Sequence, residues 1–346
     1  MKKKILRFFP CLLVLILLML PVYGEKNDRA AGDISLQEFW AGTVFPYFLP
    51  SSSTVPLQLF ESQYRRPPRY RGRGPGYGGG AHFSIKFAGG MDYLLLGDLN
   101  NHFKGMNSSF NDMADPGTLN GRFRELRWAW DGYGELIFYP TPVFGIGIGG
   151  GYLRARTRND TVTFTTFGGL WSDTREEDWI ISAIPLRLSL HFTLPVGPAA
   201  NISLSLGGAY YFGSLEMNRE TESLLWTGTE NAKGKSMNTI GGHGGISFEL
   251  KMSPNFSFVL EAQGRYAKFT SIKADLRAQG ILFLIIPIDY NAENTLFFYQ
   301  YNSGTNTYDT LEWWETAPSG PAYNSLREGT IDLSGVFFGA GFKFTF

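Results

Sequence analysis

Nine charged residues stand within alternating, largely apolar stretches of this sequence, and their chemistry is that of buried ion pairs. Successive side chains of a β-strand point to opposite faces, and these charges share the face opposite to most aliphatic and aromatic residues. Buried charges need partners, and both signs occur in similar numbers. We therefore expect a salt-bridge network in an enclosed lumen, formed by Lys86, Asp92, Asp131, Glu135, Arg187, Glu249, Glu261, Arg265 and Lys343.

Glycines on the same inward face leave two uses of this lumen open. Gly145, Gly147, Gly149 and Gly151 alternate along one stretch. They leave space either for long charged neighbours that fill the interior or for a narrow water path. The first use predicts a structural plug, and the second a gated conduit.

The pattern of potential catalytic residues does not indicate an enzyme. A Ser-His-acid site needs a base that reaches the nucleophile and an acid that orients the base. His243 occupies an inward position in the same stretch as Ser247 and Glu249, but their spacing matches no catalytic signature, and we expect His191 at an interface near a turn. The glycine run "GIGIGGG" lies inside an expected strand rather than between a strand and a helix, which argues against a phosphate-binding loop. The one cysteine is Cys11. We expect no catalysis, cofactor or metal.

The elements that position these residues are eight alternating stretches. In "NISLSLGGAYYF", Ile202, Leu204 and Leu206 share one face, and Ser203 and Ser205 the other. Strands half in lipid and half in a polar interior show this pattern. The stretches cover about 82–96, 123–139, 143–157, 179–193, 201–216, 238–252, 255–270 and 331–346.

The connections alternate between short turns and long loops. Short turns containing proline follow stretches two, four and six, and long polar loops of about 97–122, 158–178, 217–237 and 271–330 follow the others. Membrane β-barrels show this alternation, with short periplasmic turns and long extracellular loops. A soluble β-sandwich is the alternative, but it would not expose so many aromatic residues. In lipid a sheet must close on itself. The sequence thus predicts an all-β fold, an eight-stranded antiparallel transmembrane β-barrel with a periplasmic N-terminal extension.

The N-terminal part divides into a secretion signal and an extension. Residues 1–24 read as a signal peptide, with Lys2 to Arg7 as its charged region and Leu12 to Leu20 as its apolar core. Residues 25–81 read as a periplasmic extension with a linker rich in arginine, proline and glycine, and residues 82–346 as the barrel. The linker arginines are Arg65, Arg66, Arg69, Arg71 and Arg73. A solvated linker is one interpretation, and contact with anionic headgroups or a cell-wall polymer the other. The net charge is zero, and nucleic acid is not an expected partner.

The last long loop is rich in aromatic residues. They are Phe297, Phe298, Tyr299, Tyr301, Trp313 and Trp314. We expect "ILFLIIPID" and "NTLFFYQY" to extend the barrel as a hairpin. Self-packing of the loop and an extracellular ligand site are both open interpretations.

From about residue 82 onward the chain resembles the small outer-membrane β-barrel proteins of Gram-negative bacteria, the OmpA/OmpX/OmpW-like group. The eight stretches, the glycine-rich "GIGIGGGYLRA" and the ending "GAGFKFTF" carry the resemblance. It implies that Phe342, Phe344 and Phe346 form the signal read by the barrel-assembly machinery. It also implies an outer-membrane location, with outer-membrane lipids and lipopolysaccharide as neighbours. Unlike for OmpA-type proteins, we expect no C-terminal peptidoglycan-binding domain in this chain.

These observations favour a structural or surface-interaction role for an integral outer-membrane barrel. A narrow porin-like conduit for small solutes, ions or apolar molecules is the alternative. A membrane-lipid-modifying enzyme is a third and weaker hypothesis.

Overall fold

The computed structural model describes residues 80–346 except 167, 224–225, 236, 283–284 and 305. The expected signal peptide and nearly all of the N-terminal extension, including the five linker arginines, lie outside these residues.

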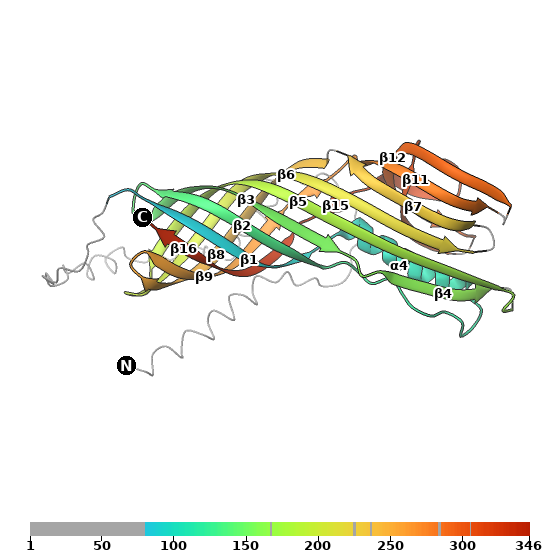
Figure 1. Cartoon of the computed structure of the whole chain (residues 1–346), viewed down its shortest axis with the longest axis horizontal. Coiled ribbons are helices and arrows are strands. Elements are labelled where there is room, and N and C mark those ends of the chain that lie inside the picture. The colour runs from blue at the N-terminus through green and yellow to red at the C-terminus, as the bar shows by residue number, and fades with distance from the viewer. Residues whose placement is uncertain (1–79, 167, 224–225, 236, 283–284, 305) are drawn as a thin grey trace, which may run out of the picture. The chain divides into compact units, whose positions relative to one another are not determined.

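Eight strands form a closed antiparallel ring (Figure 1). Each strand pairs with the next along the ring, and the last pairs with the first. They are β1 (His82–Leu94), β2 (Trp128–Tyr139), β3 (Phe144–Arg156), β5 (Trp171–Pro195), β6 (Ala200–Glu222), β8 (Met237–Ser253), β9 (Phe256–Tyr266) and β16 (Gly335–Thr345). The prediction of an eight-stranded antiparallel barrel is confirmed. Short turns join β2 to β3, β5 to β6 and β8 to β9, as the sequence predicts.

The register of the ring sets the tilt of its strands. Paired residues lead from Ser84 through Ile137, Gly147, Ser189, Gly207, His243, Arg265 and Gly335 back to Leu94, ten residues further along β1. With about 3.3 Å per residue and about 4.8 Å between strands, this offset corresponds to a tilt of roughly 40°. Side chains rather than a wide channel fill a closed barrel of eight strands.

The outer face of the ring carries an apolar belt. From Ile184 to Leu194 on β5, six alternate side chains are aliphatic or aromatic, and each is between 40% and 60% exposed. Ten residues at a tilt of roughly 40° span about 25 Å along the barrel axis, the height of the apolar band of membrane barrels. The outward side chains of β2, β6 and β16 continue the belt. Phe342, Phe344 and Phe346 belong to it, with exposures of 48%, 40% and 71%.

Beyond the belt, at the end with the long connections, the chain forms a folded part that we call the cap. It contains α4 (Gly97–Met113), β4 (Asp160–Thr166), β7 (Trp226–Lys235), β10 (Lys268–Phe269), β11 (Lys273–Leu282), β12 (Ile286–Asn302), β13 (Thr307–Trp314), β14 (Tyr323–Glu328) and β15 (Ile331–Asp332). The expectation of long polar loops is therefore wrong in its detail. The long connections fold because β5 and β6 continue past the belt and provide edges for further strands, as Figure 1 shows.

The cap sheet grows outward from β6. β7 pairs with β6, β11 with β7, and β12 with β11, and the second half of β12 lies between β13 and β14. The expectation that "ILFLIIPID" and "NTLFFYQY" form a hairpin with each other is wrong in its pairing. The first segment spans the end of β11 and the start of β12, which pair with each other, and the second lies within β12 and pairs mainly with β13 and β14.

Helix α4 places one apolar stripe against this sheet. Leu99, Phe103, Met106 and Phe110 recur at spacings of three and four residues, which puts them on one face of a helix, and all are buried. Within the described part of the chain, no helix is long and apolar enough to cross a bilayer.

Candidate functional site

The structure places all nine charged residues of the predicted network inside the ring. Each is at most 8% exposed. They form three groups along the barrel, one near the short turns, one in the middle and one below the cap.

The group near the short turns centres on Lys343. Its Nζ lies 2.8 and 3.0 Å from the carboxylate oxygens of Glu249, and it donates to the Tyr139 hydroxyl at 3.1 Å. Ser203 and Asn201 also donate to Glu249, at 3.1 and 3.5 Å. The lysine charge and the carboxylate are therefore both satisfied within the wall of the barrel.

The middle group centres on Lys86. Its Nζ lies 3.3 Å from both Glu135 and Glu261. His191 Nε2 lies 3.0 Å from Glu135 Oε1, and the Tyr133 hydroxyl donates to Glu261. Two carboxylates thus share one ammonium group, and each also lies within hydrogen-bond distance of a further side chain, His191 or Tyr133.

Arg187 connects this middle group to the far wall. Its guanidinium lies 4.2 Å from the centre of the Tyr133 ring and donates to the Gln263 side chain. Cation–π contact and a hydrogen bond to an amide compensate a charge for which the described residues provide no ion pair.

The group below the cap centres on Arg265. Its guanidinium lies 2.9 Å from Asp92 and 2.8 Å from Asp131, and its Nε donates to the carbonyl oxygen of Leu333 at 3.1 Å. Arg265 therefore links three barrel strands to the segment that returns from the cap.

Long side chains occupy the space beside the inward glycines of β3. A Cβ on Gly145 would lie 2.8 Å from the Tyr139 ring, and one on Gly151 would lie 2.8 Å from Tyr133. A Cβ on Gly147 would meet Glu135 and lie 3.0 Å from His191. Neighbouring side chains therefore occupy the lumen beside these glycines.

Several residues of this network carry no charge and were missed by the sequence reasoning. Tyr133, Tyr139 and Gln263 alternate in register with the charged residues of their own strands and therefore point inward. The alternation that identified the charged residues could have identified them too. The expectation that His191 lies at an interface is wrong, because its side chain is 3% exposed inside the ring. It shares the inward parity of Arg187, and only the register of β3 and β5 places it beside Glu135.

An apolar core lies where the upper barrel wall meets the cap. One continuous buried cluster joins Leu94, Leu153 and Tyr211 of the upper barrel wall to Phe103 of α4 and Leu333. These side chains are at most 2% exposed. Packed apolar groups therefore join the upper barrel wall to the cap.

Most of the loop aromatics take part in this packing. Phe298, Tyr299 and Trp313 are buried, and Trp313 stacks on Trp179 at 6.5 Å between ring centroids. Phe297 and Trp314 are half-buried, and Tyr301 is 41% exposed. Self-packing thus accounts for most of the aromatic content of the last loop.

Ion pairs fasten the cap as well. Asp98 of α4 receives two hydrogen bonds of 2.6 Å from Arg327 of β14 and a third, at 2.8 Å, from the Thr330 hydroxyl. Burial raises the pKa of Asp98, but the hydrogen bonds from Arg327 and Thr330 together outweigh burial and hold this pKa below its usual value.

A second pair lies deeper in the cap. Glu177 lies 3.3 Å from Arg219 and 3.2 Å from His102 Nε2, and it also accepts a hydrogen bond from Trp179. Burial alone would raise the pKa of Glu177, yet Arg219 and His102 bring it well below its usual value. The carboxylate therefore stays ionised in the core of the cap.

The one Ser-His contact found in the described lumen does not form a triad. Ser189 Oγ lies 3.0 Å from His243 Nε2, and both side chains are buried. Among the described residues no group hydrogen-bonds to His243 Nδ1, so no acid orients the ring. The partner of His243 is a serine of another barrel strand, not Ser247 or Glu249.

The closed ring, the apolar belt and the ion-paired lumen together define a transmembrane β-barrel. A sheet can cross a bilayer only when it closes on itself, and antiparallel barrels with a belt about 25 Å tall belong to outer membranes. The chain is an outer-membrane barrel protein on these grounds.

Comparisons with known proteins give distant similarities only. No protein-family model and no curated protein matches the chain. Among solved structures, the chain is similar to a major outer membrane protein from Thermus thermophilus, with 13% identity and a TM-score of 0.37, over 77% of this chain and 99% of the other. It is also similar to the outer membrane protein OprG from Pseudomonas aeruginosa, with 11% identity and a TM-score of 0.32, over 78% and 97% of the two chains.

Proposed function

We propose that this protein is a sealed outer-membrane anchor that holds a folded domain at the cell surface for contacts with the outside. The observation that carries the proposal is the state of the lumen. Its nine charged side chains are at most 8% exposed, and an apolar core lies over them. A water path along the barrel would leave such side chains solvated.

The orientation follows from the lengths of the connections. Short turns of membrane barrels face the periplasm, and long connections face outward. The cap belongs to the long connections and is extracellular in this proposal. A surface role also fits its content, because a helix and eight strands lie outside the ring in the described residues only on this side.

Conductance measurements test the sealed lumen. We expect purified protein, inserted into planar bilayers, to give no reproducible current steps, whereas a porin inserted in the same way should conduct. Reproducible steps from the wild-type chain would overturn the anchor and support the narrow conduit.

Cysteine labelling tests the orientation. The only natural cysteine is Cys11, in the expected signal peptide, so an introduced cysteine should be the single thiol of the mature chain. Lys233→Cys in the cap replaces a side chain that is 77% exposed. Gly197→Cys lies in the short β5–β6 turn, where an added Cβ meets nothing within 4 Å.

A membrane-impermeant maleimide applied to intact cells should label Lys233→Cys and leave Gly197→Cys unlabelled until the cells are lysed. The reverse result would place the cap in the periplasm. It would refute the surface role while leaving the barrel intact.

A further inference from the structure

The outward face of β3 changes character along its length. Ile146, Ile148 and Tyr152 point outward in the belt, and Arg154 and Arg156 follow on the same face. Arg158 is exposed two residues further on. At about 3.3 Å per residue and a tilt of roughly 40°, Arg154 lies about 5 Å above Tyr152 along the barrel axis. An apolar surface, an aromatic ring and a row of arginines thus follow one another in this order.

The neighbouring strand β2 supplies an aromatic border at the same height. Trp130 pairs with Arg154 across the β2–β3 ladder. Trp130 is 69% exposed, and Trp128 is 54% exposed. Aromatic girdles of this kind mark the level at which the hydrocarbon of a membrane meets its headgroups.

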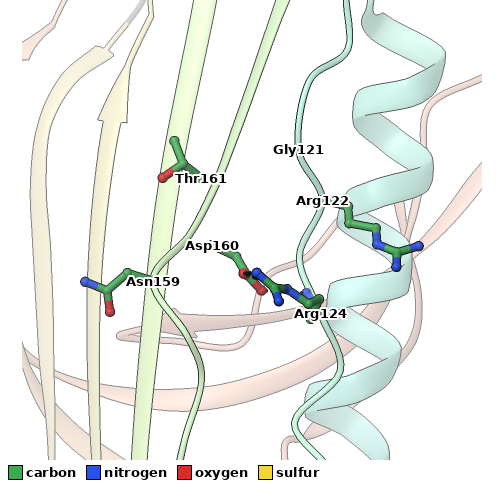
Figure 2. Close-up of a pocket in the computed structure, with 6 residues that line it drawn as sticks. All are labelled: Gly121, Arg122, Arg124, Asn159, Asp160 and Thr161. Atoms are coloured by element: carbon green, nitrogen blue, oxygen red, sulfur yellow. Dashed lines mark hydrogen bonds and ion pairs between the residues drawn. The ribbon is translucent and has the colours of Figure 1, made fainter.

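Above this border lies an open pocket of about 500 Å³ with two more arginines (Figure 2). The segment before β2 forms one wall of this pocket, and the start of β4 forms the other. A β-bridge between Asn120 and Thr163 holds the two segments together. Arg124 reaches Asp160, whereas Arg122 extends away from it, as Figure 2 shows. The lining residues are Gly121, Arg122, Arg124, Asn159, Asp160 and Thr161.

Carboxylates balance only part of this positive charge. Arg124 lies 2.8 Å from Asp160, and Arg156 lies 2.8 Å from Asp178. Glu176 accepts a hydrogen bond from Thr161 at the pocket edge. Arg122, Arg154 and Arg158 form no ion pair within the described part of the chain. Five arginines therefore face three carboxylates, and three guanidinium groups are free to bind an anion.

We propose that this surface, made of Arg122, Arg124, Arg154, Arg156 and Arg158 and bordered by Trp128, Trp130 and Tyr152, binds the phosphorylated headgroup of a lipid in the outer leaflet. The planar guanidinium group binds phosphate oxygens in bidentate fashion. The apolar belt directly below accepts the acyl chains of the same molecule. This inference deepens the proposed function, since it depends on the barrel lying in a membrane with its cap outward.

A lipid fits this surface better than a free anion does. The arginines begin one outward position above Tyr152 and beside Trp130, at the depth of headgroups rather than in bulk water. The apolar and the cationic halves are continuous on one strand face, which matches an amphiphile. A soluble phosphate would use the cationic half alone.

The test compares lipid binding by the wild type and by Arg122→Gln/Arg154→Gln/Arg158→Gln. Purified full-length protein in detergent is titrated with bisphosphorylated lipid A, with the same lipid after dephosphorylation, and with inorganic phosphate, and binding is followed by native mass spectrometry. The matched control Lys233→Gln/Arg277→Gln removes cations that are 77% and 59% exposed elsewhere in the cap.

Each arginine near a membrane contributes roughly fivefold to the affinity for an anionic headgroup, so the triple variant should bind bisphosphorylated lipid A on the order of 100-fold more weakly. The control variant should bind like the wild type. Equal binding of both forms of lipid A by the wild type would overturn the proposal, and so would displacement of the lipid by inorganic phosphate at comparable concentration. Heat-modifiable gel mobility of each variant reports the folded barrel independently, so a loss of the barrel itself is distinguishable from a loss of the lipid site.

Discussion

The substitution Arg265→Met distinguishes a sealed lumen from a hydrated one, because the two predict different losses in the free energy of unfolding. Arg265 is the only cation within ion-pair distance of Asp92 and Asp131 among the described residues. Asp92 is 0% exposed, and Asp131 is 6% exposed. Methionine keeps a similar length but leaves both carboxylates without a counter-charge.

In a sealed interior the loss should be large. Removing one partner of a buried ion pair costs about 3–5 kcal/mol, because an uncompensated charge stays buried. In a hydrated lumen, water would solvate the two carboxylates, and the loss would be about 1 kcal/mol or less. The structure therefore predicts that Arg265→Met lowers the free energy of unfolding by at least 3 kcal/mol (order of magnitude).

Urea titration of the refolded barrel in lipid vesicles, followed by tryptophan fluorescence, measures this loss as a shift of the unfolding midpoint. A second variant that adds Asp92→Asn and Asp131→Asn removes all three charges, and it should recover most of the lost stability. A loss below about 1 kcal/mol for Arg265→Met, with no recovery in the triple variant, would refute the sealed lumen.

Three further results follow from the geometry. The pKa of Asp98 is lowered in the folded cap, so its ion pair with Arg327 stabilises the cap fully above the ordinary carboxyl pKa of about 4, and this stabilisation is lost as the pH falls through the lower folded pKa. Hydrogen exchange of the α4 amides should therefore accelerate in that acidic range. Arg327→Met should remove this pH dependence of the exchange rate. Gly147→Leu should destabilise the barrel by about 1–3 kcal/mol in the same urea assay, because the new side chain meets the middle ion-pair group. Deleting Phe346 should lower the amount of heat-modifiable protein in the outer membrane severalfold, whereas Phe338→Ala, at an equally outward position of β16, should not; equal yields would contradict an assembly signal at the chain end.

The strand pattern could be predicted because the two faces of each barrel strand lie in two different and uniform environments. Lipid on one side and the lumen on the other impose an alternation that is visible in the sequence of each strand alone, as in β5 from Ile184 to Leu194. The parity of Lys86, Glu135 and Lys343 follows from the same rule. A charged side chain on the outward face would be buried in lipid at a large free-energy cost, so the charged residues identify the inward face.

The cap could not be predicted in the same way. Its strands pack against a helix and against one another, so their burial depends on neighbours distant in sequence. Asp98 and Arg327 are 229 residues apart, and His102 accepts a hydrogen bond from the backbone of Leu311. The polar composition of these segments indicated loops, but the continuation of β5 and β6 past the belt gave them a sheet to join.

The sequence by itself determined the number of barrel strands, their order and the inward face of each, because alternation with a period of two is a local property. Only the tertiary structure decided which inward charges meet. That choice depends on the ten-residue offset of the ring, which brings Lys86 of β1 to Glu261 of β9 and Arg265 to Asp92 and Asp131. The β2–β3 register likewise places Trp130 opposite Arg154. Register is a relation between strands, and it is set when the whole ring closes.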